Sequence, residues 1–195
     1  CRNVTIKCSS GHWKGWIECC PSLIHVTTLM CHVHDLIGVA HTLTQLQTLA
    51  LYECVKHYGI IEFPPNLLQL DVNIPMPDHL IWTKYRFPPS LQILGLTISS
   101  PTRDMAEPSL PIDVVLQPLA TLTSLQKLAI ISEVGLDQPK SCFPDLKNWS
   151  HLNSLCLRVA NVKTAHQILA AVPPTQWHLL KLSIEEDSGR SGMFE

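Results

Sequence analysis

The segment Leu91-Gln92-Ile93-Leu94-Gly95-Leu96 places leucine at its first, fourth and sixth positions. Clear copies of this pattern begin at Leu46, Leu67, Leu125, Leu152 and Leu179, and weaker copies begin at Cys1 and Leu23. Side chains alternate between the two sides of an extended strand. The fourth and sixth residues of each copy therefore point to one side, and the third, fifth and seventh point to the other. The pattern predicts one short strand for each copy, with one apolar side and one variable side.

The copies begin 22, 23, 21, 24, 34, 27 and 27 residues apart. Most of these intervals are typical of leucine-rich repeats, in which each strand pairs in parallel with the next and a return segment covers the apolar side. We therefore expect an α/β fold that forms an open leucine-rich-repeat solenoid, with a parallel concave sheet and an irregular or helical convex side. The expected strands lie near residues 4–6, 26–28, 49–51, 70–72, 94–96, 128–130, 155–157 and 182–184.

Composition favours a single packed unit and disfavours nucleic acid and membranes as partners. Hydrophobic residues make up 46% of the chain and charged residues 15%, which is enough apolar material for one core. The net charge of −2 provides no basic field for nucleic acid or an anionic membrane surface, and no apolar run reaches membrane-spanning length. We interpret residues 1–195 as one repeat domain of about eight repeats. The chain starts and stops inside repeats, so we expect it to be a fragment of a longer protein.

The return segments differ in kind. Helical spacing predicts a convex helix over residues 161–172, with Ala165, Ile168, Leu169 and Val172 directed inward. A second helix is expected within residues 112–122, with Val115, Leu116 and Leu119 inward and a kink at Pro118. Residues 35–43 are expected to form a third, shorter helix.

Prolines exclude helix from other return segments. Paired prolines at residues 64–65 and 88–89 lead directly into strands, which predicts extended or 3₁₀ returns there. The longest interval contains Pro101, Pro108 and Pro111, and we interpret residues 99–111 as an inserted contact loop.

Residues 20–31 carry a resemblance to a particular repeat subtype. Their sequence, Cys20-Pro-Ser-Leu23-Ile-His-Val26-Thr-Thr28-Leu-Met-Cys31, resembles the Cys-Pro-x-Leu-x-x-Leu-x-Leu-x-x-Cys signature of cysteine-containing leucine-rich repeats. That subtype is found in F-box proteins, the substrate receptors of SCF ubiquitin ligases. The resemblance implies substrate-binding repeats of such a receptor. Later repeats do not keep the cysteine position, where Pro75, Ser99, Glu133 and Ala160 stand instead.

Two alternatives remain open. The Phe-Pro-Pro-x-Leu sequences at residues 63–67 and 87–91 also look like the irregular repeats of plant nucleotide-binding immune receptors, which would make this chain a sensor domain. A purely structural solenoid within a larger protein is the other alternative.

The eight cysteines lie mostly in hydrophobic, strand-like contexts, which favours buried thiols over disulfides. This usage indicates a cytoplasmic or nuclear location rather than secretion. Adjacent side chains on an extended backbone point in opposite directions, so we expect one of Cys19 and Cys20 to be in the core and the other exposed.

No residue pattern predicts catalysis or a cofactor. Cys31, His32 and His34, with His25 and His41 nearby, are zinc-ligand types, but their spacing fits no zinc module. The sequence contains no nucleophile-elbow, zinc-protease or phosphate-loop motif. We therefore expect no catalytic residues, no metal, no cofactor and no enzymatic activity.

The variable side of the strands is the expected partner-binding surface, which we expect to be concave. Its composition mixes apolar and polar residues in the manner of a protein interface, and tyrosine and arginine are frequent hot-spot residues. The predicted contact residues are His25, Leu29, Tyr52, Gln69, Asp71, Asn73, Ile93, Lys127, Ile131, Arg158, Lys181 and Glu185.

Overall fold

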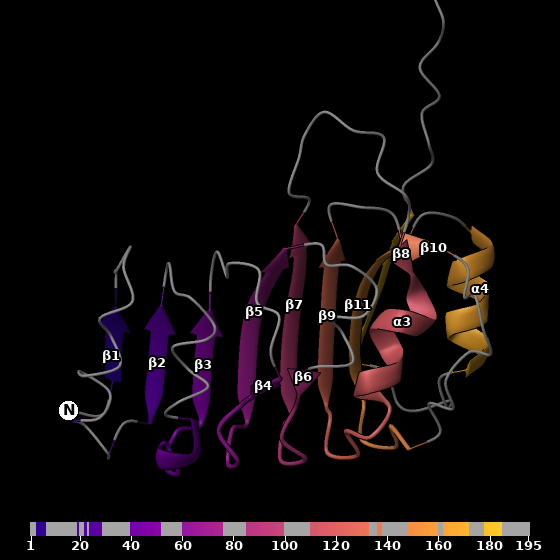
Figure 1. The fold of residues 1–195 in the computed structure, drawn as a ribbon. Coiled ribbons are helices and arrows are strands. Elements are labelled where there is room, and N and C mark those ends of the chain that lie inside the picture. Colours follow the sequence, from indigo (N-terminus) through magenta and orange to yellow (C-terminus); the bar gives the residue numbers. More distant parts are fainter. Residues whose placement is uncertain are drawn as a thin grey trace, which may run out of the picture.

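The computed structural model of the chain describes residues 3–6, 19, 22, 24–28, 40–51, 60–75, 85–99, 110–132, 136–137, 148–159, 162–171 and 178–184. Its main feature is an eight-stranded parallel sheet whose strands are arranged in chain order. The strands are β1 (Asn3–Ile6), β2 (His25–Thr28), β3 (Thr48–Leu51), β5 (Gln69–Pro75), β7 (Ile93–Ser99), β9 (Lys127–Ser132), β11 (Ser154–Val159) and β12 (Leu179–Ile184). Figure 1 shows them side by side from β1 to β11. The chain therefore has the expected α/β class with a parallel sheet, and each expected strand lies within one of these strands.

From β1 to β11 the register places equivalent motif positions opposite one another, whereas β12 is shifted by two residues, with Leu180 and Leu182 opposite Leu155 and Leu157. Leu94 pairs with Leu70 on one side and with Leu128 on the other, and Leu155 continues the row. Two residues later, Leu96 lies between Val72 and Ile130. All of these side chains are 3% exposed or less. The leucine pattern thus becomes two continuous buried rows on one side of the sheet, which we call the leucine face.

A repeated turn leads into each of five successive strands. The N–H of the first motif leucine donates to the carbonyl three residues earlier, at N···O distances of 3.0–3.3 Å. The donor and acceptor pairs are Leu46 with Leu43, Leu67 with Pro64, Leu91 with Pro88, Leu125 with Leu122, and Leu152 with Trp149. The second proline of each Pro-Pro pair occupies the second turn position, which its fixed φ angle favours. The paired prolines therefore form the same turn that Leu-Thr or Trp-Ser forms before the other strands.

Neighbouring repeats are joined just before their strands. The Leu68 carbonyl accepts hydrogen bonds from the Gln92 and Ile93 N–H groups at 2.9 and 3.0 Å, and the Gln92 carbonyl accepts from those of Gln126 and Lys127. The carbonyls of Ile24, Gln47, Gln126 and Asn153 are shared in the same way. Side chains add to this ladder, since the Asn66 amide donates to the Thr44 carbonyl and the Ser90 hydroxyl donates to that of Pro65.

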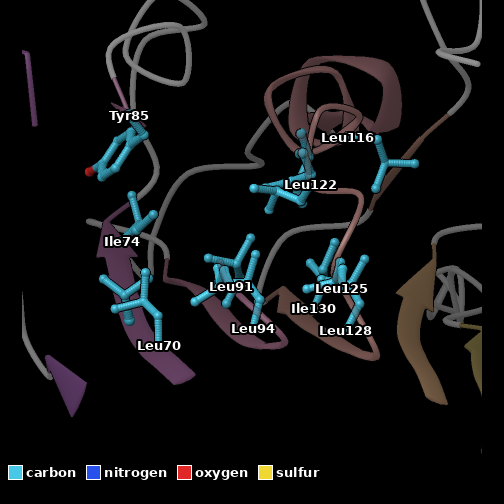
Figure 2. Close-up of a cluster of buried hydrophobic side chains, with 14 of the residues drawn as sticks. Leu70, Ile74, Tyr85, Leu91, Leu94, Leu116, Leu122, Leu125, Leu128 and Ile130 are labelled. Carbon is cyan, nitrogen blue, oxygen red and sulfur yellow. The ribbon is translucent and has the colours of Figure 1, made fainter. Parts of the chain in front are cut away.

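Short elements cover the leucine face. They are the 3₁₀ helix η1 (Ala40–Thr42), helix α3 (Ile112–Leu116), the 3₁₀ helix η3 (Gln117–Leu119), helix α4 (Val162–Ala171), and two small parallel sheets, β4 (Ile61–Glu62) with β6 (Tyr85–Arg86) and β8 (Leu110–Pro111) with β10 (Leu136–Asp137). Every described helix contributes buried residues to the same core cluster as the strand leucines. In Figure 2, Tyr85, Leu116 and Leu122 lie on one side of this core, and Leu70, Leu94 and Leu128 lie on the other. All the described helices therefore lie on one side of the main sheet.

The expected helices are partly confirmed. The helix within residues 112–122 is present as α3 followed by η3, with Pro118 in η3 and with Val115, Leu116 and Leu119 buried. The region 35–43 contains only η1 among its described residues, and residues 35–39 lie outside them. The return segments before the paired prolines contain the short strands β4 and β6, in agreement with the predicted extended returns.

One prediction about the return segments was wrong. In α4 the buried face is formed by Thr164, Ala165 and Ile168, whereas Leu169 is 41% exposed. Thr164 faces the core in place of Leu169, so the buried side of the helix does not coincide with the apolar side that the sequence predicts. Val172 lies outside the described residues. The inserted loop expected at residues 99–111 falls mostly outside the described residues, which exclude 100–109; of its ends, Ser99 belongs to β7 and Leu110–Pro111 to β8.

Ser132 is a polar side chain in an apolar row. It continues a row formed by Ile74 and Ile98, is 0% exposed, and its hydroxyl has no hydrogen-bond partner. A buried hydroxyl without a partner destabilises the native state. We expect Ser132→Ala to increase the free energy of unfolding by about 1 kcal/mol in urea titrations. Ser154→Ala is the control, since Ser154 is only half-buried and the change should have little effect. A destabilised Ser132→Ala variant would contradict this prediction.

Candidate functional site

The side of the main sheet opposite the leucine face carries the candidate site. Along β7, buried residues alternate with half-buried ones, and along β9 they alternate with half-buried or exposed ones. We call this side the open face, and it consists of the residues that register with Ile93, Gly95 and Thr97 of β7. Within the described part of the chain, no helix lies on it, because each described helix packs into the leucine-face core.

Nine of the twelve predicted contact residues are described, and all nine lie on the open face. His25, Gln69, Ile93 and Lys127 share one row of the register. Asp71 and Lys181 occupy the next row, and Asn73 and Ile131 the row after that. Arg158 registers with Ser183 of β12. Leu29, Tyr52 and Glu185 lie outside the described residues.

The centre of the open face is polar and internally hydrogen-bonded. The Gln69 side-chain amide donates to Asp71 Oδ2 at 3.0 Å, and the Ser99 hydroxyl donates to Asn73 Oδ1 at 3.0 Å. Asp71 is half-buried, and its Oδ1 lies in the space that a β-carbon at position 95 would occupy. The carboxylate is therefore laid across the backbone of the neighbouring strand, over Gly95.

Small residues around Asp71 were missed in the sequence reasoning. Ala50, Gly95 and Ala129 occupy the same row of the register as Asp71. They make a shallow strip on both sides of the carboxylate. Their shared fifth position in the motif could have identified them. At that position the sequence prediction considered only large or polar side chains.

Apolar side chains flank this polar centre. Ile93 is half-buried on β7, Ile131 is 50% exposed on β9 and Leu179 is 52% exposed on β12. The open face thus combines exposed apolar groups with oriented polar groups, a composition that suits reversible contact with another macromolecule.

A separate recess lies on the other side of the molecule. It has a volume of about 390 Å³ and is lined by Tyr85, Arg86, Phe87, Gln117, Pro118 and Thr121. The rings of Phe63, Tyr85 and Phe87 stack beside one another, with centroid separations of 5.5–6.3 Å. These rings bridge the β4–β6 sheet and the core, so they have a packing role.

The groups considered for metal binding lie partly outside the described residues. Among the residues that the structure describes, no set of three His, Cys, Asp or Glu side chains is placed to hold a metal ion. His25 and His41 are exposed, whereas Cys31, His32 and His34 lie outside the described residues. Cys19 is exposed and Cys156 half-buried, and Cys20 is also outside. No helix in the described part of the chain combines the length and apolar character needed to cross a membrane.

Comparison of the chain with protein-family models, curated proteins and solved structures finds no match. Function has to be inferred from the residues of the open face and their surroundings.

The contact between Asp71 and Gly95 gives a prediction about stability. Alanine suits a strand better than glycine by about 0.5–1 kcal/mol, but its β-carbon would displace the Asp71 carboxylate from Gln69. We expect Gly95→Ala to stabilise the chain by about that amount only in an Asp71→Ala background, and to have no benefit in the wild type. Urea unfolding of the wild type, both single variants and the double variant measures this coupling. Additive effects of the two substitutions would show that the contact is absent.

Proposed function

We propose that this chain is a protein-recognition domain, an open leucine-rich-repeat solenoid whose partner lies against the open face. The observation that carries the proposal is the division of the main sheet into two unlike sides. The leucine face is covered by every described helix, whereas the open face presents rows of exposed and half-buried side chains. A parallel sheet is ordinarily covered on both faces, so a face on which no described helix lies is a natural place for a partner.

The side chains of the open face support a protein partner over other kinds. Ile131 and Leu179 expose about half of their surface beside hydrogen-bonded polar groups. Interfaces between proteins join apolar contact area to a polar surround in this way. The described charges of this face are mixed, with Asp71 on β5 and Lys127, Arg158 and Lys181 on β9, β11 and β12, so they do not form the uniform basic surface that favours nucleic acid or an anionic membrane.

We propose binding rather than catalysis because the described residues of the open face do not form the arrangement that catalysis requires. Its described carboxylate, Asp71, is hydrogen-bonded to an amide, and no described histidine or cysteine neighbours it in the register. A nucleophile and an orienting base within hydrogen-bond reach are the usual minimum for covalent catalysis.

The narrower biological setting rests on the resemblance of residues 20–31 to cysteine-containing repeats. In that setting these repeats would hold the substrate of an F-box ubiquitin-ligase receptor in the cytoplasm or nucleus. A sensor domain of an immune receptor would use the same face for the same physical task. A purely structural solenoid would instead leave this face without a separate partner.

Partner capture by matched variants tests the proposal. Ile131 on the open face and Val162 on α4 are both 50% exposed β-branched residues, so Ile131→Arg and Val162→Arg make the same chemical change on opposite sides of the sheet. We expect Ile131→Arg to reduce capture at least about tenfold, because a charge would replace a buried apolar contact. Val162→Arg should capture partners like the wild type.

Capture is quantified by crosslinking of the tagged chain in cell extract followed by mass spectrometry, with circular dichroism as the test of folding. Equal capture by wild type and Ile131→Arg, or loss with Val162→Arg alone, would contradict the proposed face. An unchanged set of crosslinked proteins in both variants would favour the structural solenoid.

A further inference from the structure

The described charges on the open face are separated by sign. Asp71 on β5 is the only carboxylate among the described residues of this face. The lysines and arginine of the face, Lys127, Arg158 and Lys181, are on β9, β11 and β12. Lys127 and Lys181 are exposed and Asp71 is half-buried. The face is therefore acidic at its middle and basic toward β12, although the whole chain has a net charge of only −2.

The surroundings of Asp71 make its carboxylate accessible to a long side chain. The residues beside it in the register are Ala50 and Gly95, and the next along the row is Ala129. None of these has a side chain that extends above the carboxylate. Gln69 orients the group through Oδ2, and an ionised carboxylate has further acceptor positions that a cation can use.

The strand order determines how far apart the opposite charges lie across the sheet. Neighbouring strands lie about 4.8 Å apart. Asp71 and Lys127 are separated by two strand steps, from β5 through β7 to β9, and Lys181 is four steps from Asp71. The opposite charges are therefore about 10 and 19 Å apart across the sheet, which an extended peptide covers in about three to six residues.

We propose that the partner presents an extended protein segment that crosses the strands, with a Lys or Arg above Gly95 against Asp71 and an acidic residue three to six positions away against Lys127 or Lys181. This inference rests on the proposed function, because it specifies the chemistry of a partner on the same face. Charge complementarity of this kind selects both the orientation and the register of the bound segment. A uniformly acidic segment would be repelled at Asp71, and a uniformly basic one would be repelled at β9 and β12.

The probe is a display library of random twelve-residue peptides selected on the wild-type chain. We expect the selected peptides to combine a basic residue with an acidic one at the stated separation. Their affinity should fall at least about tenfold for Asp71→Asn, and also for Lys127→Glu when the two charged residues are about three positions apart or for Lys181→Glu when they are about six apart. Glu62→Gln is the matched control, because Glu62 is an exposed carboxylate on β4 outside the main sheet, and it should bind the peptides unchanged.

A charge exchange strengthens the test. A selected peptide whose acidic residue is replaced by lysine should recover binding to Lys127→Glu. Peptides that lose affinity with Ile131→Arg but are indifferent to Asp71→Asn and Lys127→Glu would overturn this inference and leave the proposed face intact. Selection of no peptide that depends on any of these residues would count against both. Circular dichroism confirms that each variant is folded.

Discussion

Register is the constraint on which the rest of the structure depends. One carbonyl just before each strand accepts two successive N–H groups of the next repeat, and a turn ending at the first motif leucine sets where that repeat begins. A shift of one residue would exchange the two faces of a strand, moving leucines to solvent and polar groups into the core. Because the same hydrogen bonds recur up to β11 in repeats with different return segments, the motif rows stay aligned there even where the intervals vary, whereas β12 is shifted by two residues.

The same alignment produces the surface chemistry. Once Leu70, Leu94 and Leu128 form a buried row, the residues between them in sequence must form rows on the other side. Asp71 meets Gly95 for this reason, although the two are 24 positions apart in sequence. Under the proposed function, folding and recognition depend on the same strand pairing: the core leucines fix the positions, and the alternate residues supply the contacts.

The strands and the residues of the open face could be predicted because side chains alternate between the two faces of a strand, and this alternation is visible in the sequence. The return segments could not be predicted as fully. Strands of two residues, such as β4 and β6, are too short to show a hydrophobic period. The side of α4 that faces the core depends on tertiary packing around Thr164 and Leu169, which the sequence of the helix does not specify. In the site, the sequence pattern predicted the rows, but it carries no information on the side-chain rotamers that join Gln69 to Asp71 or Ser99 to Asn73.

Strand order fixes the distances between side chains across this surface as multiples of the strand spacing. Each repeat contacts mainly its neighbours, so whole repeats are the units that can be gained or lost without repacking the remainder. Duplication of one repeat between β5 and β9 would move Asp71 away from Lys127 by about 4.8 Å, the spacing of one strand. Distances between functional groups across the sheet would then change during evolution in steps of one strand spacing. The side chain at each position, by contrast, can change through a single substitution.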